Sequence, residues 1–280
     1  MKRPLIVRVS RYLSYLDAAA CALLVLDRFI LKLAYIINAA IHADSNPTDT
    51  LSMMAYMAYN QRSLFAIGIS YTVRLALFGT AIAFVLALLM VFLRIQEPDK
   101  RDNDFVKFLK IVANKFSRFY IFVIRGTPMM VQLLIMSLVV FASSRNYTMI
   151  GILTLGINSG AYVSEIVRSG LMSVDPGQME AGRSLGMNYF TTMRFIVIPQ
   201  AIKNILPALG NEFITLLKDT SLITVIGGKE MVYAAQAIYG RTYEQMFPLI
   251  GIACIYLLLV MVFSWLQSLL ERRLRQSDRR

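Results

Sequence analysis

The sequence predicts an all-α polytopic membrane protein with about six transmembrane helices. Its 280 residues are 57% hydrophobic and only 16% charged, which leaves too little polar surface to cover a soluble protein of this size. The apolar residues gather into stretches long enough to cross about 30 Å of hydrocarbon as helices. Lysines and arginines fall into alternate connections between these stretches. These observations favour a bundle of membrane-spanning helices over a soluble fold.

Six apolar stretches meet the length requirement. Their approximate limits are residues 16–41, 64–93, 119–143, 148–167, 205–227 and 247–270. The first is the least apolar, but its charged and amide residues fall on one face of a helix. This helix either crosses the membrane with that face against protein or lies flat in the interface, and the sequence leaves both open. It is a poor signal peptide, since Asp27, Arg28 and Lys32 lie within the apolar run.

The distribution of positive charge tests this topology independently. With six spans, twenty Lys and Arg residues lie on the side that holds both termini and the connections 94–118 and 168–204. The other side holds only Arg62, Arg145, Lys229 and Arg241. Because cytoplasmic loops carry the excess of Lys and Arg, both termini are predicted in the cytoplasm. A nucleic-acid-binding protein would also explain a net charge of +12, but not why the excess follows the order of the spans.

The third span has an ambiguous beginning. Phenylalanines and lysines alternate at helical spacing over residues 99–118, which predicts an amphipathic helix in the inner interface. Arg125, Gly126, Thr127 and Pro128 follow it. Because Pro128 breaks a helix, the span begins either at 119 or near Pro128, and in the second case Arg125 reaches back to the inner surface.

The long cytoplasmic connection 173–207 predicts a short helix of about ten residues. Asp175 and Pro176 provide an N-cap and a first-turn proline, and Gln178 stands where a capping box has Glu or Gln. Gly186 suits a left-handed helix end.

A second short helix follows in the same connection. Asn188 can cap a helix from Tyr189 to about Ile198, which Pro199 interrupts or kinks. Two short helices outside the bilayer have no evident role towards lipid, so a protein partner is predicted at this connection.

The same connection resembles the EAA loop of ABC importer permeases. Three segments stand at the family's spacing, namely Glu180-Ala181-Gly182, Gly186 and Ile196-Val197-Ile198-Pro199. Further segments look like the polar amino acid subfamily, namely Arg125 to Pro128, Ala161 to Arg168, Gly177 to Ala181 and Leu217 to Leu222. The resemblance covers about residues 64–270. Gly182 departs from the family's usual second alanine, a mild change in a small-residue position, and residues 1–62 have no counterpart in the usual five-span core.

The resemblance implies three parts of the chain. They are an N-terminal extension at 1–62 with one extra hydrophobic helix, a permease transmembrane domain at 63–272 that includes the coupling loop 173–207, and a basic cytoplasmic tail at 273–280. It also implies a multi-pass protein of the bacterial inner membrane that forms the path of an ATP-driven importer of polar amino acids. It does not identify the amino acid.

The resemblance also implies which partners the chain needs. No G-x-x-x-x-G-K-[S/T] motif occurs in the sequence, so ATP and Mg²⁺ are expected on a separate ATPase dimer, with no cofactor in this chain and no enzyme activity of its own. A second permease subunit, identical or homologous, and an external amino acid-binding protein complete the importer, with lipid but no nucleic acid as a further partner. The residues implied in coupling to the ATPase are Glu180, Ala181, Gly182, Arg183 and Gly186.

Polar residues within the predicted spans are the candidates for the solute path, because charge in lipid is costly unless paired or hydrated. These candidates are Asn158, Ser159, Glu165, Asn211, Glu212, Lys218 and Asp219. Glu165 could instead pair with Arg168, and Lys218 with Asp219. Tyr162 is interpreted as a packing aromatic. Cys21 and Cys254 lie in apolar runs without partners at metal or redox spacing, so they are predicted core residues and no metal site is indicated.

Three other classes remain as alternatives. A secondary transporter or channel needs no ATPase, and the spacing of the EAA loop argues against it. An intramembrane enzyme needs a nucleophile and a base, but the single histidine, His42, lies outside the core and is predicted to be a solvated surface residue. A structural scaffold is excluded only by the motif match.

Overall fold

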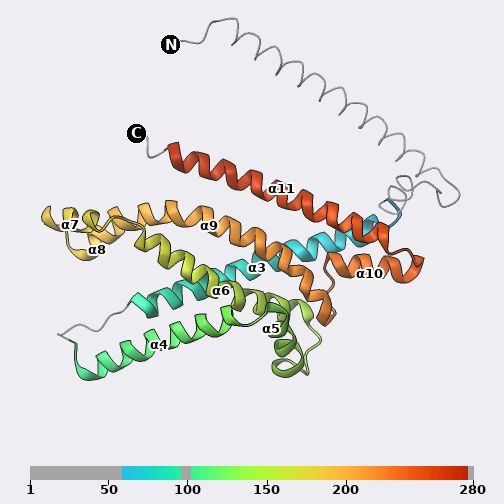
Figure 1. The fold of residues 1–280 in the computed structure, drawn as a ribbon, viewed down its shortest axis with the longest axis horizontal. Coiled ribbons are helices and arrows are strands. Elements are labelled where there is room, and N and C mark those ends of the chain that lie inside the picture. The colour runs from blue at the N-terminus through green and yellow to red at the C-terminus, as the bar shows by residue number, and fades with distance from the viewer. Residues whose placement is uncertain (1–58, 96–101, 277–280) are drawn as a thin grey trace, which may run out of the picture.

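The computed structural model describes residues 59–95 and 102–276. They form long helices along a common axis, with α7 (Pro176–Ser184) and α8 (Tyr189–Thr192) at one end and α10 (Met231–Thr242) at the other (Figure 1). Neither described range contains a strand, which confirms the all-α class for this part of the chain. The predicted helix 16–41, most of the N-terminal extension and the last four residues lie outside the described residues.

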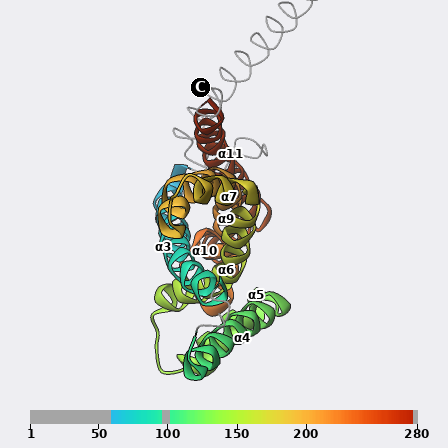
Figure 2. The ribbon, with the colours of Figure 1, turned by 90° about the vertical axis from the view of Figure 1, so that its left-hand side faces the viewer.

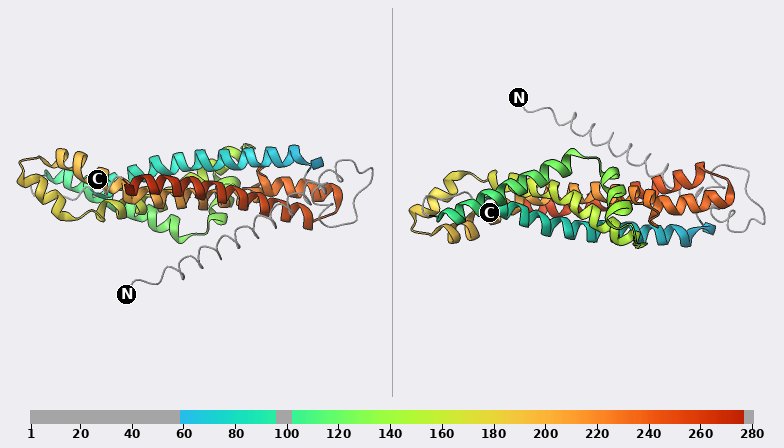
Figure 3. Two further views of the ribbon diagram at one scale, coloured as in Figure 1. Left: turned by 90° about the horizontal axis from the view of Figure 1, so that it is seen from above. Right: turned by 90° about the horizontal axis from the view of Figure 1, so that it is seen from below.

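Four long helices form the body of the molecule: α3 (Arg62–Ile95), α6 (Tyr147–Met172), α9 (Ile198–Asp219) and α11 (Met246–Gln276). α6 packs between α3 and α9, and α11 lies against the outer side of α9 (Figures 1 and 2). Views from above and below show the same elongated bundle (Figure 3). Small residues allow the close packing of α3 on α6, since Ala83 and Ala87 are fully buried against Val163.

Three helices of the described chain are long and apolar enough to cross a membrane: α3, α6 and α11. A fourth span is present if α4 (Asp104–Gly126) and the bent segment after it are taken together. α9 runs beside α6 but carries charged and amide side chains, and it does not meet this criterion of length and composition. Cys254 is exposed on α11, so the prediction of a core position was wrong.

The amphipathic helix predicted at 99–118 forms as α4, but its predicted end was wrong, because α4 runs unbroken from Asp104 to Gly126. Three polar side chains fasten it to its neighbours: Asn114 donates to the Arg94 carbonyl at 2.8 Å, Ser117 to the Met90 carbonyl at 2.9 Å, and Tyr120 to the Ile157 carbonyl at 2.6 Å. Their spacing of three residues makes one polar stripe that faces α3 and α6. The phenylalanines lie on the opposite, exposed side.

The break at Pro128 is confirmed. α4 ends at Gly126, and the chain continues as α5 (Met129–Ile135) and the π-helix η1 (Met136–Val140), bent by 105° relative to α4. This bend turns the chain away from the axis of α4 at its Gly126 end (Figure 2).

Of the two outcomes predicted at Pro199, interruption or a kink, the interruption was wrong. α8 continues through the π-helix η2 (Met193–Val197) into α9, which begins at Ile198 and not near 205. The Ile198 amide donates to the Met193 carbonyl, a bond over five residues. This wider turn comes directly before Pro199, whose missing N–H makes an ordinary helical bond impossible. The last ten residues of the predicted connection 173–207 therefore belong to α9.

The sequence analysis did not predict α10. It follows the short helix η3 (Thr220–Ile226) and a left-handed turn at Gly227. Glu230 caps α10 by accepting from the Tyr233 amide at 3.0 Å. Its fully buried carboxylate also accepts from the Thr224 and Tyr256 hydroxyls, so this residue fastens η3, α10 and α11 together.

Candidate functional site

The short helix α7 forms as the sequence predicts. The Asp175 carboxylate accepts from the Gly177 amide at 2.8 Å, and Gly186 has a φ of 82°, in the left-handed region. The predicted capping box is absent from the hydrogen bonds of this segment, because the Gln178 side chain accepts from Gln200 at 3.3 Å instead. The second N-cap is confirmed, since the Asn188 side chain accepts from the Thr191 amide at 2.8 Å.

The five predicted coupling residues lie together on α7 and at its end. Glu180, Ala181, Arg183 and Gly186 are exposed, whereas Gly182 is buried against α8. Large apolar side chains surround them at this tip of the molecule, and the sequence analysis did not identify these residues. They are Leu185, Tyr189, Phe190 and Phe195. An exposed surface that combines charge with aromatic rings is typical of a protein-binding site.

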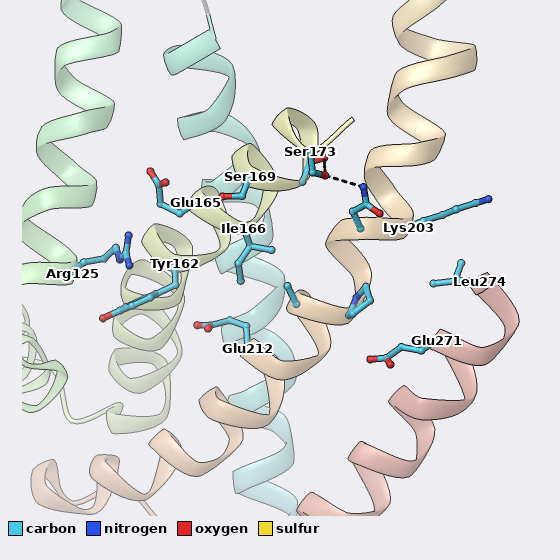
Figure 4. A pocket seen from close by; sticks show the side chains of 14 residues that line it. Arg125, Tyr162, Glu165, Ile166, Ser169, Ser173, Lys203, Glu212, Glu271 and Leu274 are labelled. Atoms are coloured by element: carbon cyan, nitrogen blue, oxygen red, sulfur yellow. Dashed lines mark hydrogen bonds between the residues drawn. The ribbon is translucent and has the colours of Figure 1, made fainter. Parts of the chain in front are cut away.

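Three adjoining cavities lie along α4, α6 and α9, with volumes of about 820, 510 and 450 Å³. We call them the first, second and third cavity. All three are lined by Arg125 and Tyr162. Figure 4 shows Arg125 of α4, Tyr162 of α6 and Glu212 of α9 around the first cavity. The three cavities thus lie next to one another and bring charged side chains of α4, α6 and α9 together inside the bundle.

Arg125 lies at the end of α4 and extends towards α6. The guanidinium carbon of Arg125 lies 5.0 Å from the centre of the Tyr162 ring, within the range of a cation–π interaction. Arg125 also occupies the last turn of α4, where the helix dipole favours a positive charge. Tyr162, predicted as a packing residue, lines every one of the three cavities.

Two of the predicted path residues meet at the α6–α9 contact. The Ser159 hydroxyl donates to Oε1 of Glu212 at 2.7 Å, and Ser159 is buried. Glu212 lines both the first and the second cavity. The hydrogen bond from Ser159 therefore fixes the position of the Glu212 carboxylate at the wall of these two cavities.

Asn158 lines the second cavity and is connected to the bend after α4. Its amide donates to Oε1 of Gln132 at 3.0 Å, and Gln132 in turn donates to the Ile124 carbonyl at 2.8 Å. Gln132 thus satisfies a carbonyl left free at the end of α4. Sequence reasoning missed Gln132, although an amide one turn after a helix-breaking Pro128 is a usable signal.

Glu165 forms the pair with Arg168 that the sequence analysis considered, at 2.9 Å, and a second ion pair with Arg94 at the end of α3. It nevertheless lines the first and third cavities. Asn211 lies apart from this region, because its side chain accepts from Gln267 of α11 at 3.1 Å and it lines none of the three cavities.

Lys218 and Asp219 differ in their surroundings, although the charge of Lys218 still acts on Asp219. Asp219 lines the second cavity, whereas Lys218 is exposed. Within residues 59–95 and 102–276, no ion pair joins them. The second cavity therefore contains two carboxylates, Asp219 and Glu212, and the guanidinium of Arg125.

Comparison with known proteins identifies relatives over most of this chain. The family model described as binding-protein-dependent transport system inner membrane component matches residues 107–276. The arginine transport system permease protein ArtQ of Bacillus subtilis is 33% identical over 216 residues, 75% of this chain and 92% of the relative. The glutamine transport system permease protein GlnP of Escherichia coli K12 is 35% identical over 171 residues, 59% of this chain and 77% of the relative.

A solved structure of an amino acid ABC transporter with histidines matches with a TM-score of 0.69 and 42% identity. The match covers 81% of this chain and 99% of that chain. The methionine transporter MetNI in an inward-facing conformation has a TM-score of 0.62 at 17% identity, which indicates a common fold.

Proposed function

This chain belongs to the family of inner membrane components of binding-protein-dependent transport systems, and on that premise we propose that it is the permease subunit of an ATP-driven importer of polar amino acids. The observation that carries the proposal is the polar region inside the bundle, where Arg125, Glu212 and Asp219 line one cavity. An amino acid needs partners of both signs when it leaves water, because its ammonium and carboxylate groups are costly to bury alone. The second cavity provides both signs.

In this proposal α7 transmits the action of ATP. A separate ATPase subunit binds Mg-ATP and contacts Glu180, Ala181, Gly182, Arg183 and Gly186. Support comes from the exposed charged and aromatic side chains at that end of the bundle. Two permease subunits enclose the path, and a solute-binding protein delivers the amino acid at the α10 end. The sequence-derived charge bias supports placing both termini and α7 in the cytoplasm.

Uptake into proteoliposomes tests the function. The chain is co-purified with the ATPase and binding protein that associate with it, and radiolabelled amino acids, sugars and peptides are compared with and without ATP. We expect ATP-dependent uptake of polar amino acids. Uptake that continues without ATP would make the chain a secondary transporter, and a preference for sugars or peptides would contradict the amino acid assignment.

Two variants test the path residues. Hydrogen bonds to charged groups contribute about 1.5–3 kcal/mol, so Glu212→Gln and Arg125→Gln should each lower uptake by about tenfold or more. Asn211→Ala is the matched control, because Asn211 precedes Glu212 on α9 but bonds to α11 and lines none of the cavities. Equal loss in all three variants would place the path elsewhere.

A further inference from the structure

The third cavity has a different chemical character from the other two. It lies between the end of α3, the second half of α4, and α6, and has a volume of about 450 Å³. Among the described residues, three arginines line it, Arg94, Arg118 and Arg125, with one carboxylate, Glu165. The remaining wall includes the ring of Phe122.

The carboxylate does not balance the arginines of the third cavity. Glu165 is already shared between Arg94 and Arg168, so one negative charge serves two positive ones. Glu212 acts on Arg125 from the first and second cavities. Arg118 forms no ion pair within the described part of the chain. Counted over the described residues, the cavity therefore has an excess of positive charge, and Arg118 is the arginine that forms no ion pair with any of them.

Arg118 lies near the end of the bundle that carries α7. Arg94 is in the last turn of α3, at the end of the bundle that carries α7. Its carbonyl accepts a hydrogen bond from the Asn114 side chain, so Asn114 of α4 lies beside the end of α3. Arg118 is one helical turn further along α4, about 6 Å deeper. Because the candidate span of α3 ends at Arg94, a guanidinium at that depth would lie close to where phospholipid phosphates and glycerol groups meet the hydrocarbon.

The wall of the third cavity continues into an apolar surface. Phe122 lines the cavity and is nevertheless 76% exposed, and the neighbouring Phe119 is 66% exposed. A small soluble anion would contact the arginines but would make no apolar contact with these rings. A phospholipid matches both features, with its phosphate at the arginines and its acyl chains along Phe119 and Phe122.

We propose that the third cavity binds the phosphate headgroup of an anionic phospholipid from the leaflet at the α7 end, with Arg118 as its principal contact. Basic pockets between membrane helices on the cytoplasmic side recognise such headgroups by charge. The third cavity shares Arg125 and Tyr162 with the proposed solute path, but Arg118 lines neither the first nor the second cavity, so its substitution tests the lipid site alone.

The test measures thermal unfolding of the detergent-purified complex of this chain with its ATPase. It compares phosphatidylglycerol, phosphatidylcholine with the same acyl chains, and inorganic phosphate. Only phosphatidylglycerol should raise the melting temperature of wild type. Arg118→Gln should weaken its apparent affinity about fivefold, equivalent to about 1 kcal/mol for one basic contact. Arg118→Lys should retain most of the affinity.

Lys115→Gln is the matched control, because Lys115 is an exposed base on the same helix that does not line the cavity. It should leave the response to phosphatidylglycerol unchanged. The proposal would be overturned if phosphatidylcholine stabilised the wild type as much as phosphatidylglycerol does. It would also be overturned if phosphatidylglycerol stabilised Arg118→Gln with the same apparent affinity as the wild type. Stabilisation by inorganic phosphate to the same extent would make this a site for a free anion and overturn the assignment to lipid.

Discussion

The Ser159 hydroxyl donates a hydrogen bond of 2.7 Å to the Glu212 carboxylate, which joins α6 to α9 at the wall of the two larger cavities. Ser159 is itself 4% exposed. Because its side chain is buried, we expect Ser159 to affect a solute through the position of Glu212 and not by direct contact.

Two substitutions at Ser159 should distinguish the loss of the hydrogen bond that positions Glu212 from steric obstruction by a larger side chain. Ser159→Ala removes the donor and should lower the free energy of unfolding by about 1 kcal/mol, with a moderate loss of uptake. Ser159→Phe inserts a ring between two packed helices, which should lower it by about 1–3 kcal/mol and abolish uptake. Thermal unfolding and uptake by the reconstituted importer check both. Wild-type uptake with Ser159→Phe would show that the α6–α9 contact does not border the path.

The orientation of the chain can be tested with single cysteines. Cys21 and Cys254 are first replaced by serine. Glu244→Cys lies in the connection between α10 and α11, and Ser184→Cys at the end of α7, at opposite ends of the bundle (Figure 1). With α7 in the cytoplasm, an impermeant maleimide should label Glu244→Cys in intact cells and Ser184→Cys only after the membrane is opened. The reverse pattern would contradict the prediction from positive charge.

Local features of this chain could be predicted from its sequence. The caps at Asp175 and Asn188 join atoms two or three residues apart, and the left-handed turn at Gly186 needs no Cβ. The long apolar helices follow from composition in the same way. In each of these features the interacting residues are close together in the sequence, so a local sequence pattern includes all of them.

Contacts between helices could not be predicted in this way. Glu165 and Arg94 are 71 residues apart, and Ser159 and Glu212 are 53 residues apart. The error over α4 has a related cause. Its lysines and phenylalanines indicated an interfacial helix, whereas the polar stripe from Asn114 to Tyr120 that binds it to α3 and α6 had meaning only once those partners were known.

The left-handed turn at Gly186 gives a prediction about coupling. Its φ is 82°, and a Cβ added there would meet no atom within 4 Å, so the cost of a side chain comes from the backbone alone. Gly186→Val should cost about 1–2 kcal/mol locally and reorient α7, with loss of ATPase binding and uptake but normal membrane insertion. Co-purification of the ATPase measures this effect. Gly186→Asn should be much milder, because Asn tolerates this conformation.

Gly240→Ala is a matched control for Gly186, because its added Cβ also meets no atom within 4 Å but its φ is not in the left-handed region. It lies within the helix α10, where alanine is favoured over glycine by about 1 kcal/mol. ATPase binding should remain normal. If Gly186→Val bound the ATPase as well as Gly240→Ala does, the turn would have no part in coupling.

The packing of Gly182 against Thr192 gives the sharpest prediction, and it corrects the expectation that alanine and glycine are nearly equivalent at residue 182. A Cβ on Gly182 would lie 2.5 Å from Cγ2 and 2.9 Å from Oγ1 of Thr192, which is fully buried and bonded to the Asn188 carbonyl. Gly182→Ala should therefore push α7 away from α8, cost about 1–3 kcal/mol and weaken ATPase binding. Thr192→Ala removes both obstructing atoms and one hydrogen bond, a loss of about 1 kcal/mol. The double variant should bind the ATPase better than Gly182→Ala alone, because the two substitutions relieve one another. Co-purification of the ATPase with all three variants measures this coupling, and strictly additive losses would mean that Thr192 is not what requires glycine at residue 182.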